Sequence, residues 1–293
     1  MGGYSINARF FAPPEALAGC FTSFYLLECD SGDDPYLDDM LQPEWGNLRF
    51  FLGAAPEAQV KGERSLKDTP FTATGPSTAP IRFRLRSTRM WGVGLLPLGW
   101  AKFIGLPACN FVNGLYDGLK HPAFAQFVRL FDRLSASTAS DKNQADLICD
   151  HFLALDQPVR DAERIATVHE ALLDPSLNEV GTMAERTGMN RRTLERICTR
   201  HFGFPPQLLI RRQRMMRSLA AYMLEHGARW SEVIDTNYHD QAHFSREFHA
   251  FMGISPSEYG ALHHPVLGAF MEARKLALGS PVQTLDPPHP SST

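Results

Sequence analysis

A pattern of residues recurs in the C-terminal half of this chain at a fixed offset of fifty positions. The first copy is Leu194-x-Arg196-x-Cys198-x-x-x-Phe202-Gly203-x-x-Pro206, and the second is Phe244-x-Arg246-x-Phe248-x-x-x-Met252-Gly253-x-x-Pro256. Each apolar position returns as apolar, and the Arg, Gly and Pro return unchanged. Internal similarity at one offset means that the same supersecondary unit is built twice.

Each copy has the start and stop residues of a helix. Asn190 and Asp240 stand where a side chain can accept hydrogen bonds from the first free backbone amides. Gly203 and Gly253 suit the left-handed position after a helix end, and the proline three residues later prevents continuation. An apolar stripe at helical spacing lies between these limits, formed by Leu194, Ile197 and Cys198 in one copy and by Phe244, Phe248 and Phe251 in the other.

A shorter helical run precedes each copy, at 179–186 and at 231–235. Gly188 and Asn237 mark the turns between the two helices, because both residue types tolerate positive φ. A short helix, a tight turn and a capped helix together form a helix-turn-helix. The run 206–223 predicts a long, stiff helix that joins the two units.

The stretch 186–217 is strongly basic. It contains nine arginines and one acid, Glu195, so its charge is 9 − 1 = +8, whereas the whole chain is formally −3. Arginines interleaved with apolar residues at helical spacing suit a helix that binds a polyanion. The alternative is a solvated basic face on an ordinary helix. The repeat favours DNA binding.

Residues from about 164 to 259 resemble the DNA-binding domain of AraC/XylS-type transcriptional regulators. The resemblance rests on NYHDQAHFSREFHAFMGISPSEY, residues 237–259, and on GMNRRTLERICTRHFGFPPQ, residues 188–207. Two departures stand out: Asn237 occupies a position where the family has Gly, and Gly260 occupies one where an Arg commonly follows the Tyr. The second departure predicts the loss of one phosphate contact.

The outward residues of the two copied helices are the expected DNA contacts. The resemblance places Arg192, Glu195 and Arg196 at base-reading positions, where Arg suits guanine and Glu suits cytosine. The remaining expected contacts are Arg191, Thr199, Arg200, Arg211, Arg212, Gln241, Ala242, His243, Ser245 and Arg246. A salt bridge within the domain is the alternative role of Arg196 and Arg246. Arg211 and Arg212 are expected to contact phosphates, and both are expected to face outward together with Arg214 and Arg217 on the same helix.

The N-terminal half predicts a β-rich domain, so the fold class is α+β. Short β-type runs at 21–29, 48–52, 81–86 and 91–96 are separated by turn residues, and an acidic stretch, 30–39, reads as a solvated loop. The pattern favours a small barrel or sandwich with helices on one side. The family resemblance implies a cupin-like barrel. Apolar stripes in 121–134 and 144–155 predict two helices that either cover this barrel or form a dimer interface.

A small-molecule effector is expected in the N-terminal half, with Trp45, Arg49, Arg82, Arg84 and Trp91 as candidate binding residues. In 81–86 arginines alternate with apolar residues, so they either line an anion site or form the polar face of a strand. Each tryptophan either stacks on the ligand or fills the core.

Catalysis and metal binding find little support in the sequence. The first histidine is His121, so clustered histidines cannot hold a metal in the barrel. The chain lacks a Gly-x-Ser-x-Gly elbow and a P-loop, and no cofactor is expected. Five widely spaced cysteines indicate reduced thiols in the cytoplasm, and no apolar run suits a membrane span.

Three segments are expected: an effector-binding or dimerisation domain at 1–160, a DNA-binding domain at 161–263, and a tail at 264–293 that is helical and then disordered from about Gly279. The predicted protein is a sequence-specific transcription regulator, an activator or a repressor, that binds double-stranded DNA as a homodimer and contacts RNA polymerase. One alternative is a constitutive regulator whose barrel only mediates assembly. Another is an enzyme tethered to DNA.

Overall fold

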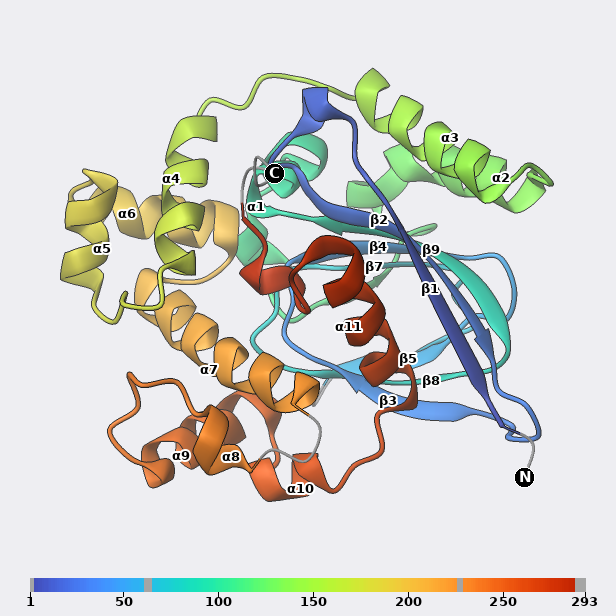
Figure 1. Ribbon diagram of the computed structural model, residues 1–293. Coiled ribbons are helices and arrows are strands. Elements are labelled where there is room, and N and C mark those ends of the chain that lie inside the picture. The colour runs from blue at the N-terminus through green and yellow to red at the C-terminus, as the bar shows by residue number, and fades with distance from the viewer. Residues whose placement is uncertain (1–2, 61–64, 226–228, 288–293) are drawn as a thin grey trace.

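The computed structural model describes residues 3–60, 65–225 and 229–287, and its N-terminal half contains two antiparallel sheets (Figure 1). One sheet has the order β1 (Ser5–Phe11), β2 (Phe21–Asp30), β9 (Thr88–Leu95), β4 (Gly46–Phe51), β7 (Phe71–Thr74) and β10 (Leu115–Asp117). The other has the order β3 (Leu37–Leu41), β8 (Ile81–Leu85), β5 (Glu57–Val60) and β6 (Leu66–Lys67). The predicted α+β class with a small β-domain is confirmed.

The central strands of the six-stranded sheet are buried on both faces. In β2, Phe24 and Leu26 face the helical side, whereas Tyr25 and Leu27 face the opposite sheet. Successive side chains of a strand point to opposite faces, so a strand covered on both sides is apolar throughout. This explains why β2 and β9 lack the polar–apolar alternation of a half-exposed strand.

Helices cover the outer face of this sheet. The helical elements of the N-terminal half are η1 (Glu15–Leu17), α1 (Pro97–Gly99), η2 (Trp100–Ile104), η3 (Ala108–Asn110), η4 (Pro122–Phe127), α2 (Val128–Ala136) and α3 (Asp141–Ala154). Phe127, Leu130, Leu134, Ile148 and Phe152 from this group pack onto the sheet in one core. Of the two predicted roles for the helix pair α2–α3, covering the β-domain is therefore realised within one chain.

The C-terminal half is helical and built around α7 (Figure 1). Its elements are α4 (Ala162–Leu173), α5 (Val180–Thr187), α6 (Arg191–Ile197), the π-helical turn η5 (Cys198–Phe202), α7 (Pro206–Leu224), α8 (Trp230–Val233), α9 (Gln241–Met252) and α10 (Pro256–Gly260). The first unit, α5–α6, and the second, α8–α9, lie at opposite ends of α7. Its 19 residues span about 28 Å.

The two halves share hydrophobic cores. Trp45 and Leu96 of the β-domain pack with Val168 of α4, Ile197 of α6 and Phe202 of η5. Met40 of β3 packs with α7, α9 and the helix that follows α10. The C-terminal half is thus docked on the β-domain.

The C-terminal segment, which we define as residues 265–287, returns to the β-domain. Helix α11 (Pro265–Leu278) lies against β1 and β3, the adjacent edges of the two sheets, and η6 (Gln283–Leu285) follows it (Figure 1). The expectation of disorder from Gly279 is wrong for 280–287, because Val282, Thr284 and Asp286 are buried. Residues 288–293 lie outside the described part of the chain.

The acidic stretch 30–39 also differs from its prediction. Asp39 belongs to β3, is buried, and accepts hydrogen bonds from the backbone amides of Val266 and Leu267 at 2.9 and 2.7 Å. Its other oxygen lies 2.9 Å from Nδ1 of His264. A carboxylate at a helix N-terminus satisfies free amides and complements the helix dipole. Asp39 therefore caps α11 and is not part of a solvated loop.

Within the described residues, no helix combines the length and the apolar character that crossing a bilayer requires.

Candidate nucleic-acid interface

The first unit has the local structure that its sequence predicts. Helix α5 ends at Gly188, whose φ is +63°, and the side chain of Asn190 accepts from the amide of Thr193 at 2.9 Å. Leu194 and Ile197 are fully buried. Gly203 has φ +87° after η5. The residue types at these positions are the ones that helix ends require.

The second unit has the same kind of side-chain N-cap on its reading helix as the first unit, but its turn has a different backbone conformation. Asp240 accepts from the amide of His243 at 2.6 Å, and Gly253 has φ +72°. Asn237, however, does not adopt positive φ, so the expectation of a left-handed residue here is wrong. Its backbone and side-chain N–H groups instead donate to Asp235, at 2.9 and 2.8 Å.

The prolines of the two copies begin new helices. Pro206 is the first residue of α7 and Pro256 the first of α10, positions where the missing N–H costs nothing. Gly260, the other departure from the family, also has a packing reason. A Cβ at this position would lie 2.3 Å from the hydroxyl of Tyr222, whose ring stacks on Trp230 at 3.8 Å.

Both reading helices, α6 and α9, present an exposed face. The exposed residues among the expected DNA contacts are Arg191, Arg192, Glu195, Arg196, Arg200, Gln241, Ala242 and Arg246. Thr199, Arg211, His243 and Ser245 are partly buried. The opposite faces of α6 and α9 are buried, so each helix can approach a groove without losing its core.

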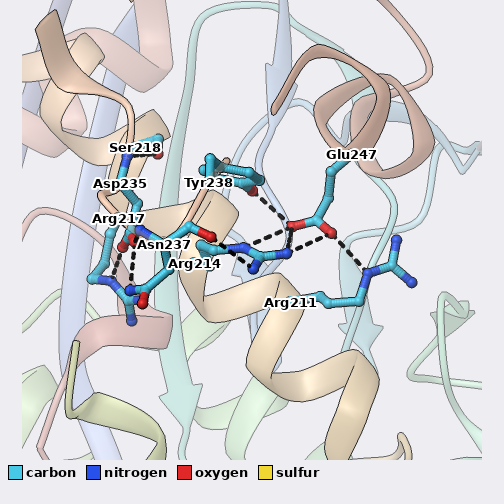
Figure 2. A network of polar contacts seen from close by, with 8 residues as sticks. All are labelled: Arg211, Arg214, Arg217, Ser218, Asp235, Asn237, Tyr238 and Glu247. Atoms are coloured by element: carbon cyan, nitrogen blue, oxygen red, sulfur yellow. Dashed lines mark hydrogen bonds and ion pairs between the residues drawn. The ribbon is translucent and has the colours of Figure 1, made fainter. Parts of the chain in front are cut away.

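Three arginines of α7 form ion pairs with the second unit (Figure 2). Arg211 donates to Glu247 of α9 at 2.8 Å, and Arg214 donates to both oxygens of the same carboxylate at 2.9 and 3.0 Å. The hydroxyl of Tyr238 donates to it at 2.7 Å. Burial opposes ionisation of Glu247, but the hydrogen bonds from Arg211, Tyr238 and Arg214 prevail and lower its pKa. A buried carboxylate held by this many donors fixes α9 on α7.

A second ionic contact joins α7 to the turn before α9 (Figure 2). Nε of Arg217 donates to Asp235 at 2.5 Å, and the backbone amide of Asp235 donates to Ser218 at 2.9 Å. Only 11% of the Arg214 side chain and 16% of the Arg217 side chain are exposed. The prediction that these two arginines face outward is therefore wrong.

Arg212 corrects the sequence prediction most clearly. Its side chain is fully buried between the two halves of the molecule, with the guanidinium 3.6 Å from the ring centroid of Trp45. Nη1 donates to the carbonyl of Ser77 at 3.1 Å, whereas Nε and Nη2 have no partner among the described residues. Burial lowers the pKa of Arg212 to about 9. In this arrangement Arg212 cannot contact a DNA phosphate.

Arg196 combines exposure with a salt bridge. Its Nη1 lies 3.3 Å from Asp161, which also pairs with Arg164 at 3.0 Å and lies 3.4 Å from Nε2 of His201. About half of the Arg196 side chain, 49%, remains exposed. The alternative role for Arg196, a stabilising ion pair, is thus present in the structure, and its outer face is still free to meet a duplex.

A cavity of about 120 Å³ lies between the two sheets. Of the five effector candidates only Arg49 lines it. Trp91 and Trp45 fill cores outside it, while Arg82 and Arg84 are exposed on the outer side of β8. The arginines of 81–86 therefore form a polar outer face, where Arg82 and Arg84 border an open surface hollow and Arg84 pairs with Asp38 at 3.0 Å.

The polar end of the cavity is a cluster around Glu44, a residue that the sequence did not single out. Arg49 donates to both carboxylate oxygens at 2.8 and 2.7 Å, and Thr74 donates to one at 3.0 Å. Tyr25 donates to Asn47 at 3.2 Å, on the same wall. Burial disfavours the charge of Arg49, but the neighbouring Glu44 raises its pKa. Period-two alternation cannot show which face of β4 lines a cavity.

Comparison with known proteins supports the reading of the C-terminal half. Residues 183–261 match a family model described as a helix-turn-helix domain. No curated protein sequence matches the chain. Proteins in which one long helix joins two helix-turn-helix units, as in this chain, form a class of DNA-binding proteins. This region is an AraC-type helix-turn-helix domain, and it supports the prediction that the chain is a DNA-binding transcription regulator.

Solved structures of similar shape include ToxT from Vibrio cholerae, with 12% identity, a TM-score of 0.45, and coverage of 87% of this chain and 97% of that one. Another ToxT structure, described as bound to an unsaturated fatty acid, has 10% identity, a TM-score of 0.42, and coverage of 88% and 96%. The AraC-like transcriptional activator CuxR has 12% identity, a TM-score of 0.32, and coverage of 80% and 86%. At these identities and TM-scores the likeness says nothing of what this chain binds.

Proposed function

We propose that this chain is a sequence-specific regulator that inserts α6 and α9 into successive major-groove segments of one duplex. The observation that carries the proposal is the exposure of one face on each reading helix, at the two ends of a single rigid α7. Two such helices on one face of B-DNA should lie roughly 34 Å apart, one turn of the duplex.

The outward side chains of α6 and α9 form two groups, one suited to base edges and one suited to phosphates. Arg192, Glu195 and Arg196 on α6 suit base edges, and Ala242, Ser245 and Arg246 occupy the equivalent positions of α9. Arg191, Thr199 and Arg200 suit phosphates, as do Gln241 and His243 on the second helix. Arg211 keeps an exposed outer edge and adds a phosphate contact beside its ion pair.

Selection of bound sequences from random duplex DNA tests this function. The expected result is an enriched site with two half-sites about 10 base pairs apart, centre to centre. An insertion of five base pairs between the half-sites, which turns them to opposite faces of the duplex, should then abolish tight binding. Equal binding to all duplexes at moderate ionic strength would refute sequence-specific recognition.

The β-domain is proposed as an effector sensor, with the cavity beside Glu44 and Arg49 as the site. The supporting observation is a cavity between the sheets whose wall includes the segment that follows the DNA-binding domain. A ligand that raises the melting temperature and changes DNA affinity would support a sensor, since coupling is reciprocal. A constitutive regulator would show neither effect, and turnover of candidate metabolites would indicate a tethered enzyme instead.

Assembly and placement complete the proposal. We propose a cytoplasmic homodimer, with the solvent side of α3, where the Leu153 side chain is 40% exposed, as the contact surface. Sedimentation of wild type and of Leu153→Asp would test this, because a charge at a dimer interface should shift the protein to monomers. Contact with RNA polymerase is proposed for the DNA-bound form and is testable by cooperative binding to a promoter.

A further inference from the structure

The C-terminal segment forms one wall of the cavity between the sheets. Val266, Phe270, Met271 and Arg274 of α11 line it, together with residues 281–283, which lead into η6. The rest of the wall comes from the inner faces of both sheets. Because α11 spans the gap between the edge strands β1 and β3, entry from that side requires this segment to move.

The charges in the wall define the ligand that fits. Glu44 is saturated by Arg49, Thr74 and Asn47, and Arg274 pairs with Asp286. Every charged group in the wall already has its counter-ion, so a charged ligand would have to break a buried pair. The remaining wall is mainly apolar. At about 120 Å³ the space resembles the roughly 150 Å³ cavity that holds benzene in another protein. The geometry therefore suits a compact, uncharged, largely apolar molecule.

The same segment touches the DNA-binding domain. The side chain of Gln283 accepts from the amide of Trp45 at 2.9 Å and donates to the carbonyl of Gly46 at 3.2 Å, which fastens the segment to β4. The next residue, Thr284, accepts through its carbonyl from Gln213 of α7 at 2.6 Å. A displacement at Gln283 is thus one residue away from the helix that holds both reading units.

Some buried polar groups at the contact between the C-terminal segment and α7 lack hydrogen-bond partners among the described residues. Oγ1 of Thr284 and Oε1 of Gln213 are buried without a hydrogen-bond partner among the described residues. An unpaired buried polar atom costs stability, so the contact between α7 and η6 is one that a modest change could shift.

We propose that the C-terminal segment is the movable wall of the cavity, and that an uncharged, mainly apolar small molecule bound there alters DNA affinity through Gln283, Thr284 and Gln213. This inference rests on the proposed sensor function of the β-domain. It differs from that function in naming the ligand class and the element that carries the signal.

The test uses the full chain, a duplex obtained by selection, and two matched pairs of probes: 1-hexanol with hexanoate, and benzyl alcohol with benzoate. The alcohols should raise the melting temperature by roughly 2 °C or more and change the Kd for the duplex about fivefold. The carboxylates should do neither. Ala58→Leu fills the cavity from β5 and should remove both effects; Leu115→Phe fills it from β10 if the first variant folds poorly.

Gln283→Ala tests the transmission. It should keep most of the alcohol-induced melting shift and lose most of the change in DNA affinity, while Leu276→Ala, at the 90% exposed residue of α11, keeps both. Without any probe, Gln283→Ala should speed hydrogen exchange in 280–287 and in α7 together.

Equal response to carboxylates, or no response to either alcohol, would overturn the ligand class. Unchanged exchange in α7, or intact coupling in Gln283→Ala, would overturn the transmission. Failure of sequence-specific DNA recognition would give a different result, because no duplex would then be selected at all.

Discussion

The two helix-turn-helix units repeat in sequence but are held in place differently. Positions 197 and 247 are equivalent in the repeat. Ile197 is buried in an apolar core with the β-domain, whereas Glu247 is buried in a cluster of ion pairs with α7. Caps and outward faces are therefore set by the repeat, while each unit acquires its attachment from its own neighbours.

The exposed faces differ as well. The first unit exposes four arginines and one acid, which are Arg191, Arg192, Arg196, Arg200 and Glu195. The second exposes Gln241, Ala242 and Arg246 at the equivalent region. Phosphate neutralisation supplies most non-specific affinity for DNA. The first unit should thus dominate electrostatic attraction, and the second should add register and sequence preference.

The largest expected effect concerns the ionic attachment of the second unit. Glu247→Ala leaves Arg214 and Tyr238 buried without their partner, and breaking a buried pair costs about 3–5 kcal/mol. We expect a loss of this size in urea denaturation, with an early transition of the second unit reported by Trp230. Glu195→Ala, at an exposed acid of the first unit, should change stability by less than about 0.5 kcal/mol. A loss below 1 kcal/mol for Glu247→Ala would mean that apolar packing alone holds α9.

The next prediction separates reading from attraction within the first unit. Arg192→Ala should relax base preference at one position of the site, at a cost of about 1–3 kcal/mol of discrimination. Arg200→Ala should weaken all duplexes alike and reduce the salt slope by about 1. Salt-dependent binding to the selected and to a scrambled duplex measures both, with Gln241→Ala as the uncharged comparison. Equal losses on the two duplexes for Arg192→Ala would remove it from the base-reading set.

Local features of these units were predictable, because they depend on neighbours in the sequence. Asn190, Asp240, Gly203 and Gly253 each act within one helix turn, and the apolar stripes follow helical periodicity. The error at Arg212 has a different origin. Outward-facing arginines require one solvent-exposed face on α7, but this helix contacts both units and the β-domain, so it is buried on more than one face.

The candidate effector site illustrates the same limit. Arg49 lines the cavity because β4 turns that face inward, and its partner Glu44 precedes the strand. Nothing within either stretch distinguishes this face from the opposite one, since both faces of β4 are buried. Likewise, Asp39 finds its amides more than two hundred residues later, at Val266 and Leu267. Contacts of that separation follow from the assembled sheets and not from local pattern.

A smaller effect is expected at the anchor of the first unit. Burial opposes ionisation of Asp161, but hydrogen bonds from Arg196, Arg164 and His201 prevail and lower its pKa to about 2. A carboxyl whose pKa is lowered by folding contributes stability above its unfolded pKa, near 3.8, and loses it as pH falls toward 2. The contribution should be on the order of 1 kcal/mol, because solvent screens these partly exposed pairs.

Stability measured from pH 6 to pH 2.5 for wild type and Asp161→Asn tests this. The two curves should differ at pH 6 and converge in the acid range. Parallel curves would show that Asp161 does not titrate as the ion pairs require, and would leave the first unit held by apolar contacts alone.

The smallest expected effect concerns Arg212, which lies between the two halves of the molecule. Among the described residues, Arg212 is a buried cation with one hydrogen bond, one aromatic face and two unpaired nitrogens, so its removal should cost little. Replacing such a group by an apolar side chain of similar length is often neutral or stabilising. Arg212→Met should therefore change the free energy of unfolding by less than about 1 kcal/mol and leave the salt slope of DNA binding unaltered. Arg214→Met, two positions along the same helix, should instead destabilise the protein strongly, because it leaves Glu247 short of its principal partner. The contrary result would be a salt slope reduced by one unit in Arg212→Met with stability unchanged. Arg212 would then have to leave Trp45 and contact a phosphate in the DNA-bound state. In that case the two halves would separate when DNA binds.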